Sequence, residues 1–115
     1  AKNTALTVIL ALSYGSREEI TDATQRIAQK VASGHLKPED ISREIVSSHL
    51  DTADFPDPDL LIRTSGELRL SNFLLWQLSY AEFFISPKNW PDFHKSDFRE
   101  AIEDYSRRHR RFGRV

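Results

Sequence analysis

The feature that most constrains the fold is a nearly unbroken apolar run, Ala5 to Leu12, close to the beginning of the chain. It carries no charge and includes three consecutive β-branched residues, Thr7, Val8 and Ile9. Such a run is typical of a strand in a parallel sheet that is covered on both faces. We therefore expect a central strand here.

Two helices are predicted to follow this run. Ser16 and Glu19 have the spacing of a capping box, so the first helix is expected to begin at Ser16 and to end near Gly34. A second, shorter helix is expected from Lys37 to about Leu50, where apolar residues again recur at helical spacing. The 54–58 segment contains two prolines, which lack the amide donor, and it is expected to be a loop.

The second half of the chain predicts two more strands and two more helices. In chain order these are a strand at 60–62, a helix at 72–80, a strand at 83–85, a turn at 90–93, and a last helix capped by Ser96 with Phe98, Ile102 and Tyr105 on one face. The alternation predicts an α/β fold with a mainly parallel sheet flanked by helices. Three strands are fewer than the ~5 to 6 of an average sheet. We expect residues 1–115 to supply part of one domain and not to fold alone.

Composition excludes several classes of function. The formal net charge is −1, which argues against general nucleic-acid binding, although basic residues gather at the C-terminus. There is no cysteine, so disulfide frameworks and thiolate zinc sites are excluded, and the four histidines are scattered. No apolar run reaches the ~20 residues of a membrane span, and no targeting peptide is visible, so we expect a soluble protein.

The connection between the strand at 60–62 and the next predicted helix carries the residues best suited to an anion. Arg63, Arg69 and Ser71 fall within it, near Gly66, which allows close backbone approach. Arginine suits diphosphate because its planar fork donates two parallel hydrogen bonds while staying charged. If Ser71 or Asn72 began a helix, its free amides would add to the site. A solvated loop in which the arginines pair with a neighbouring carboxylate is an equally weighted alternative.

Two other features leave alternatives open. Glu82 lies in an apolar setting, where a carboxylate needs a partner such as a divalent cation or the cation of a buried salt bridge. The basic tail from Arg107 to Arg114 could contact nucleic acid, a membrane surface or a phosphate ligand. Composition alone favours a solvated helix end.

One stretch carries a family resemblance. Residues 59–77 read DLLIRTSGELRLSNFLLWQ, which resembles the signature of cis-prenyltransferases, including undecaprenyl and dehydrodolichyl diphosphate synthases. The resemblance continues through YAEFF at 80–84, WPDF at 90–93, Tyr105 and RRFG at 110–113. SYGSR at 13–17 is similar to the family's Asn-Tyr-Gly-Gly-Arg segment. The resemblance thus covers effectively the whole chain, as the C-terminal half of one cis-prenyltransferase domain.

The resemblance implies an activity and a set of site residues. It implies transfer of an allylic diphosphate's prenyl group to isopentenyl diphosphate, giving a Z-configured product. Arg63, Arg69 and Ser71 would hold the isopentenyl diphosphate, the two arginines as catalytic groups, and Glu82 would help to bind Mg²⁺. Arg111 and Gly113 would form the family's Arg-x-Gly motif, which reaches the substrate of the partner subunit across a homodimer or heterodimer interface.

Part of the family's site is absent from this sequence. The Asp-Gly-Asn-Gly-Arg loop that holds the allylic diphosphate does not occur, so the N-terminal half of the enzyme is an expected partner. Ser13 and Leu68 replace the family's usual Asn and His, and Ser65 replaces a glycine, a harmless change provided that its φ is not positive. The alternative function is a noncatalytic partner subunit. The location stays open between cytoplasm and an organelle, a plastid included, with peripheral membrane contact.

Overall fold

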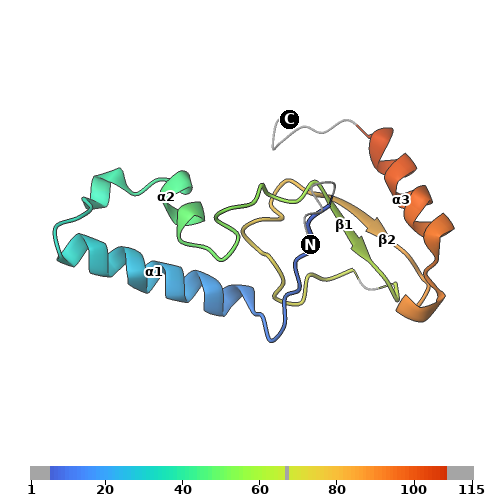
Figure 1. Ribbon diagram of the computed structural model, residues 1–115, viewed down its shortest axis with the longest axis horizontal. Coiled ribbons are helices and arrows are strands. Elements are labelled where there is room, and N and C mark those ends of the chain that lie inside the picture. Colours follow the sequence, from blue (N-terminus) through green and yellow to red (C-terminus); the bar gives the residue numbers. More distant parts are fainter. Residues whose placement is uncertain (1–5, 67, 109–115) are drawn as a thin grey trace.

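The computed structural model describes residues 6–66 and 68–108. Its elements, in chain order, are α1 (Ser16–Ala32), η1 (Pro38–Asp40), α2 (Arg43–Ser48), β1 (Leu60–Arg63), β2 (Glu82–Ile85), η2 (Trp90–Asp92) and α3 (Lys95–Ser106). Figure 1 shows α1 and α2 together at one end of the molecule, the two strands near the middle and α3 at the other end. Among the described residues, no helix is both long and apolar enough to cross a bilayer.

The two strands form a parallel pair. Leu60 lies opposite Glu82, and Arg63 lies opposite Ile85. Their carboxyl ends therefore meet at the same edge, which places Arg63 at that edge of the sheet. Parallel strands flanked by helices confirm the predicted α/β fold class.

The predicted central strand at the start of the chain is wrong for the residues that the structure describes. Residues 6–12 have no regular secondary structure, and the sheet of the described region consists of β1 and β2. Leu10 and Leu12 are 79% and 82% exposed. An isolated strand has no neighbour for its backbone hydrogen bonds, so apolar sequence alone does not produce one. Ala5 lies outside the described residues.

The first predicted helix is confirmed, but its predicted cap is wrong. The helix starts at Ser16, and Gly15 is its N-cap. Ser16 and Glu19 are both buried, and their side chains bond to distant segments, as described below, so they do not form a capping box.

The second predicted helix is interrupted in its middle. It consists of η1 and the short α2, and the Ser42 hydroxyl between them accepts a hydrogen bond from the Ile45 amide at 3.1 Å. The serine starts a new helix because its side chain satisfies one of the free amides of the first turn.

The predicted helix at 72–80 is also wrong, and the backbone gives the reason. Ser71, Asn72 and Leu74 have φ values of 54°, 64° and 46°. Left-handed residues interrupt a right-handed helix, so residues 72–80 form turns instead.

The last helix forms as predicted, with a different cap. It starts after His94, whose amide donates to Asp97 Oδ2 at 2.8 Å, so Ser96 is not the N-cap. Phe98 and Ile102 are 52% and 44% exposed, so the predicted apolar face of this helix is largely uncovered.

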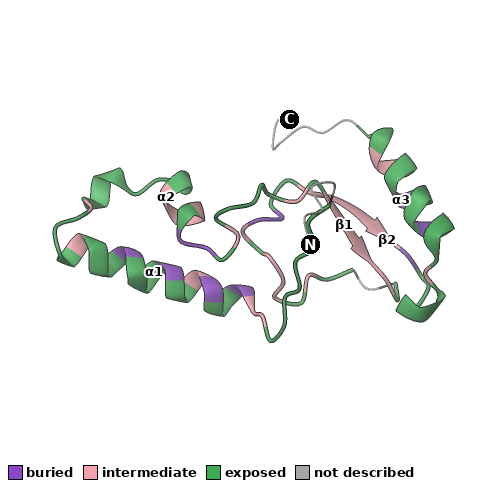
Figure 2. Cartoon of the chain, viewed as in Figure 1, coloured by how far each residue is buried: buried purple, intermediate pink, exposed green. Residues whose placement is uncertain are grey.

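The apolar core of the described region is small. Its buried apolar residues are Ala23, Ile27, Leu50, Leu78 and Ala101. In Figure 2 the buried positions of α1 line the face that looks toward α2, while residues 6–12 are exposed along their length. The accessible surface is 9246 Å², against roughly 6,500 Å² for a compact protein of this mass. The radius of gyration is 17.3 Å, against roughly 13 Å for a compact domain of this length. The chain is therefore much more open than a self-contained domain of its size.

Candidate anion-binding site

The candidate site lies at the carboxyl ends of the two parallel strands. Ser65 donates its amide to the Lys88 carbonyl at 2.7 Å, and Gly66 donates its amide to the Ser86 carbonyl at 2.7 Å. The loops that follow β1 and β2 are thus tied together. Open parallel sheets usually place their ligands at this edge.

The turn after β1 uses the left-handed region of the backbone. Ser65 and Gly66 have φ values of 65° and 66°. The condition that a serine at position 65 avoids a positive φ is therefore not met, and a left-handed non-glycine residue costs roughly 1–2 kcal/mol. The Ser65 hydroxyl donates to Asn89 Oδ1 at 3.0 Å, a contact that helps to hold the turn.

Two of the three predicted anion ligands come together. Arg63 Nη2 donates to the Ser71 hydroxyl at 3.5 Å, the outer limit of a hydrogen bond. Arg63 is half-buried and Ser71 is exposed. Because this bond is long and a guanidinium has five donors, Arg63 keeps donors available for an anion.

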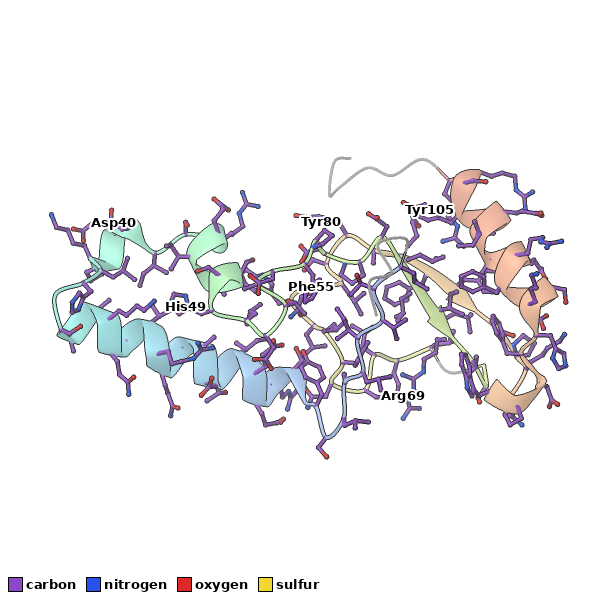
Figure 3. The ribbon with its side chains drawn as sticks, viewed as in Figure 1. Asp40, His49, Phe55, Arg69, Tyr80 and Tyr105 are labelled. Atoms are coloured by element: carbon purple, nitrogen blue, oxygen red, sulfur yellow. The ribbon has the colours of Figure 1, made fainter. Side chains whose placement is uncertain are left out.

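Arg69 is exposed on the same connection, and its side chain extends outward from the loop (Figure 3). Its convergence with Arg63 on one ligand stays a prediction. Arg111 and Gly113 lie outside the described residues.

The turn that carries Ser71 is fastened to the start of α1. Asn72 accepts the Ser16 amide on its main-chain oxygen and the Arg17 amide on its side-chain Oδ1, each at 2.8 Å. Asn72 Nδ2 donates to Glu18 Oε1 at 3.1 Å. The sequence reasoning considered Asn72 only as a possible helix start and missed the contacts of its side chain.

A buried carboxylate holds the same junction from the inside. Glu19 accepts hydrogen bonds from the Tyr14 hydroxyl, from Gln77 Nε2 at 3.2 Å and from the Asp51 amide at 2.7 Å. It is only 7% exposed. Burial, and then the hydrogen bond to Glu19, raises the pKa of Tyr14. The sequence drew attention to Ser16 and Glu19 through their capping-box spacing. In the structure both side chains instead make long-range contacts.

A cavity of about 520 Å³ opens beside this carboxylate. It is lined by residues of the 9–15, 51–58 and 73–74 segments, and the exposed apolar side chains of Leu10 and Leu12 form part of its wall.

Glu82 has a cation as its partner in the structure. Arg108 Nη1 lies 3.1 Å from Glu82 Oε2, and Arg108 Nη2 lies 2.6 Å from Asp104 Oδ2. Both carboxylates raise the pKa of Arg108, Glu82 with the larger effect. Of the two partners that the sequence left open for Glu82, this is the salt bridge, in half-buried form.

The donor set for Mg²⁺ is therefore sparse. In the region that the structure describes, no three acidic or histidine side chains cluster closely enough to hold a metal ion. A single carboxylate fits Mg²⁺ when substrate phosphates supply further oxygens. Glu82 can be that carboxylate, and Arg108 pairs with its Oε2.

Lys88 is a second cation at the strand ends that the sequence reasoning missed. Its Nζ lies 2.8 Å from Asp97 Oδ1, which ties the loop after β2 to the first turn of α3. This pairing raises the pKa of Lys88. Lys88, and then the His94 amide, holds the pKa of Asp97 below its usual value.

Comparison with known proteins gives the family. A family model described as "Putative undecaprenyl diphosphate synthase" matches residues 1–113. An isoprenyl transferase from Porphyromonas gingivalis is 56% identical over 115 residues, covering 100% of this chain and 45% of that protein. The chain belongs to the undecaprenyl diphosphate synthase family.

Solved structures of similar proteins agree with this membership. Lavandulyl diphosphate synthase from Lavandula x intermedia, solved in complex with dimethylallyl diphosphate, is 49% identical with a TM-score of 0.85, over 89% of this chain and 44% of that one. A probable undecaprenyl diphosphate synthase from Campylobacter jejuni is 38% identical with a TM-score of 0.73, over 90% of this chain and 45% of that one. The chain thus resembles these two solved structures in both sequence and fold.

The chain spans about half the length of these relatives. An isoprenyl transferase from Agrobacterium fabrum is 58% identical over 113 residues. The match covers 98% of this chain and 46% of that protein. The region that this chain matches is therefore about half of a larger structure in each of these relatives.

Proposed function

We propose that this chain supplies the isopentenyl diphosphate site of a cis-prenyltransferase, which condenses isopentenyl diphosphate with an allylic diphosphate. The observation that carries the proposal is the contact between Arg63 and Ser71 at the carboxyl end of β1. The names of the relatives support a transferase over a noncatalytic partner subunit. The Lavandula relative binds a diphosphate ester on the same fold.

The proposed reaction balances as a single alkyl transfer. The terminal carbon of the isopentenyl double bond forms a bond to the allylic carbon. The allylic carbon–oxygen bond breaks, and diphosphate leaves with the electron pair. Transfer of a proton from the isopentenyl unit to the departing diphosphate or to water then places a new Z double bond in the product.

The residues of this chain would bind and orient the isopentenyl substrate. Arg63 and Arg69 would donate to the phosphate oxygens in the bidentate geometry that guanidinium groups favour, and the Ser71 hydroxyl would add a donor. Holding the double bond against the allylic carbon turns an encounter of two substrates into a positioned reaction. The allylic diphosphate itself would be held by residues outside this chain.

Glu82 would hold Mg²⁺ together with oxygens of the bound diphosphate. When bound, the ion would supply charge stabilisation for diphosphate oxygens. Arg108 pairs with Glu82 Oε2, so the arginine and the ion would share one carboxylate.

The rest of the polypeptide would complete the fold. Residues 6–12 are apolar and exposed, and a further part of the enzyme would cover them. The Arg111 to Gly113 segment would then extend to the substrate of the partner subunit in a dimer. The exposed apolar surface supports the first statement, and the family resemblance supports the second.

Steady-state kinetics of the complete protein, with Arg63→Ala and Arg69→Ala made separately, test the proposed function. Each variant should raise the KM for isopentenyl diphosphate by at least about tenfold, because a charged hydrogen bond to phosphate contributes roughly 1.5–3 kcal/mol. The KM for the allylic substrate should change little. Arg99→Ala, at an exposed position of α3, is the matched control. An unchanged KM for isopentenyl diphosphate in both variants would show that the arginines do not bind it.

A further inference from the structure

We propose that Asn72 is a positioning residue for the diphosphate site, and that its side chain fixes the Ser71 turn against the first turn of α1. The inference rests on the proposed function, since Ser71 is taken to bind diphosphate. It assigns a role to a residue that need not touch the substrate. The role is to join the 63–72 segment to the 13–17 segment by hydrogen bonds.

The contacts of Asn72 join two segments that lie 55 residues apart. Its Oδ1 accepts the Arg17 amide at 2.8 Å, and its main-chain oxygen accepts the Ser16 amide at 2.8 Å. Both donors belong to the first turn of α1, where amides have no partner within the helix. In return, the Ser16 hydroxyl accepts the Leu75 amide at 2.9 Å. The turn and the helix therefore satisfy each other's free backbone groups.

The backbone of the turn needs this support. Ser71 and Asn72 both have positive φ values, 54° and 64°. Asparagine tolerates this region better than most residues, whereas serine there is strained. Because the Ser71 hydroxyl already lies 3.5 Å from Arg63, relaxation of the turn would separate the two groups. The side-chain bonds of Asn72 keep the hydroxyl beside the guanidinium.

Gly15 makes room for this arrangement. A Cβ at position 15 would lie 2.6 Å from Glu18 Oε1 and 2.9 Å from Asn72 Nδ2. The φ of Gly15 is −137°, so the backbone angle does not require glycine here. The requirement is space for the bond between Asn72 and Glu18.

A reciprocal exchange of amide and carboxylate tests the role of the side chain. Asn72→Asp keeps the acceptor for the Arg17 amide and tolerates positive φ, but it places a carboxylate against Glu18. Glu18→Gln keeps an acceptor for Asn72 Nδ2. The double variant Asn72→Asp/Glu18→Gln restores a donor and an acceptor with the roles reversed, and it has the same net charge as the natural protein.

The complete protein should respond in a specific pattern. Asn72→Asp should raise the KM for isopentenyl diphosphate by about tenfold and leave the KM for the allylic substrate within about twofold. Glu18→Gln alone should stay within about twofold for both substrates, and the double variant should recover to within about threefold. Asn72→Gly keeps the backbone freedom but loses both side-chain bonds, so it should behave like Asn72→Asp. Thermal unfolding of each variant identifies any that fail to fold.

The failures of the two proposals are distinguishable. If Arg63→Ala weakens binding of isopentenyl diphosphate while Asn72→Asp and Asn72→Gly bind it normally, the positioning role is wrong and the proposed function stands. If the double variant has the same raised KM for isopentenyl diphosphate as Asn72→Asp, loss of the Asn72–Glu18 hydrogen bond is not the cause of the weaker binding. If Arg63→Ala also binds normally, the proposed function fails as well.

Discussion

Residues 6–12 and the first turn of α1 lie close together in the sequence, yet the first segment exposes apolar side chains while the second buries two polar ones. Leu12 is 82% exposed, whereas Ser16 is 0% and Glu19 is 7% exposed. The buried polar groups have partners inside the chain, from Asp51 and from the 72–77 segment. The exposed apolar side chains lack such cover among the described residues.

This contrast separates the structure that the chain determines by itself from the structure that it does not. Hydrogen bonds are directional, and unsatisfied buried groups are costly, so the polar junction fixes the turn that carries Ser71. Apolar burial has no such direction and depends on the total surface available. The site's local geometry is therefore set within the chain, whereas most of the core would come from elsewhere.

The largest expected effect concerns the exposed apolar segment, residues 6–12. In the complete protein, Leu10→Asp should lower the free energy of unfolding by at least about 3 kcal/mol, because a covered position would bury an unpaired charge. Urea unfolding measures the change. The control Leu68→Asp, at a position that is 80% exposed, should cost less than about 1 kcal/mol. Equal costs at both positions would mean that residues 6–12 stay uncovered in the complete protein.

The next effect concerns the buried carboxylate of Glu19. Glu19→Ala should lower the free energy of unfolding by about 3 kcal/mol, because the Tyr14 hydroxyl, Gln77 Nε2 and the Asp51 amide all lose their acceptor. Urea unfolding of the complete protein again provides the measurement. Thr24→Ala removes an exposed hydroxyl from the same helix and should change stability by less than about 0.5 kcal/mol. A cost no larger than that of Thr24→Ala would show that the network contributes little.

Substitution of two glycines is expected to have a smaller effect on stability. Gly66 and Gly34 both have positive φ values, 66° and 80°, so alanine at either position should destabilise by about 1 kcal/mol. Only Gly66 lies at the strand ends, so only Gly66→Ala should also weaken binding of isopentenyl diphosphate. Calorimetry of both variants separates backbone strain from a local effect on the site. Equal binding by both would place the site away from the turn after β1.

The smallest effect concerns pH. The folded-state pKa of Asp97 is lowered, chiefly by Lys88, so its ionised form stabilises the fold above its unfolded pKa of about 3.8. That contribution is lost as pH falls below this value, through the lowered folded pKa. Asp97→Asn should therefore flatten the acid limb of the melting-temperature profile slightly. Identical profiles for Asp97→Asn and the natural protein would contradict the assignment.

The sequence predicted the parts of the site that depend on local pattern. The strand at 60–62, the parallel pairing and α1 were predicted correctly, whereas the anion-binding role of the polar residues after that strand stays a prediction. The helix predicted at 72–80 failed because an apolar run favoured it, while the left-handed Ser71 and Asn72 leave no signature in composition. The bond from Arg17 to Asn72 joins residues 55 positions apart, and pattern reasoning carries no information at that range. Ser16 and Glu19 were placed correctly in the helix, but tertiary contacts replaced their expected local role.

Equilibrium binding of isopentenyl diphosphate to the complete protein, natural and with Arg63→Ala/Arg69→Ala combined, tests most directly whether the connection after β1 grips the diphosphate. The double variant should bind isopentenyl diphosphate at least about a hundredfold more weakly, because two charged hydrogen-bonding groups are removed from the anion. Affinity within about twofold of the natural protein would contradict this prediction.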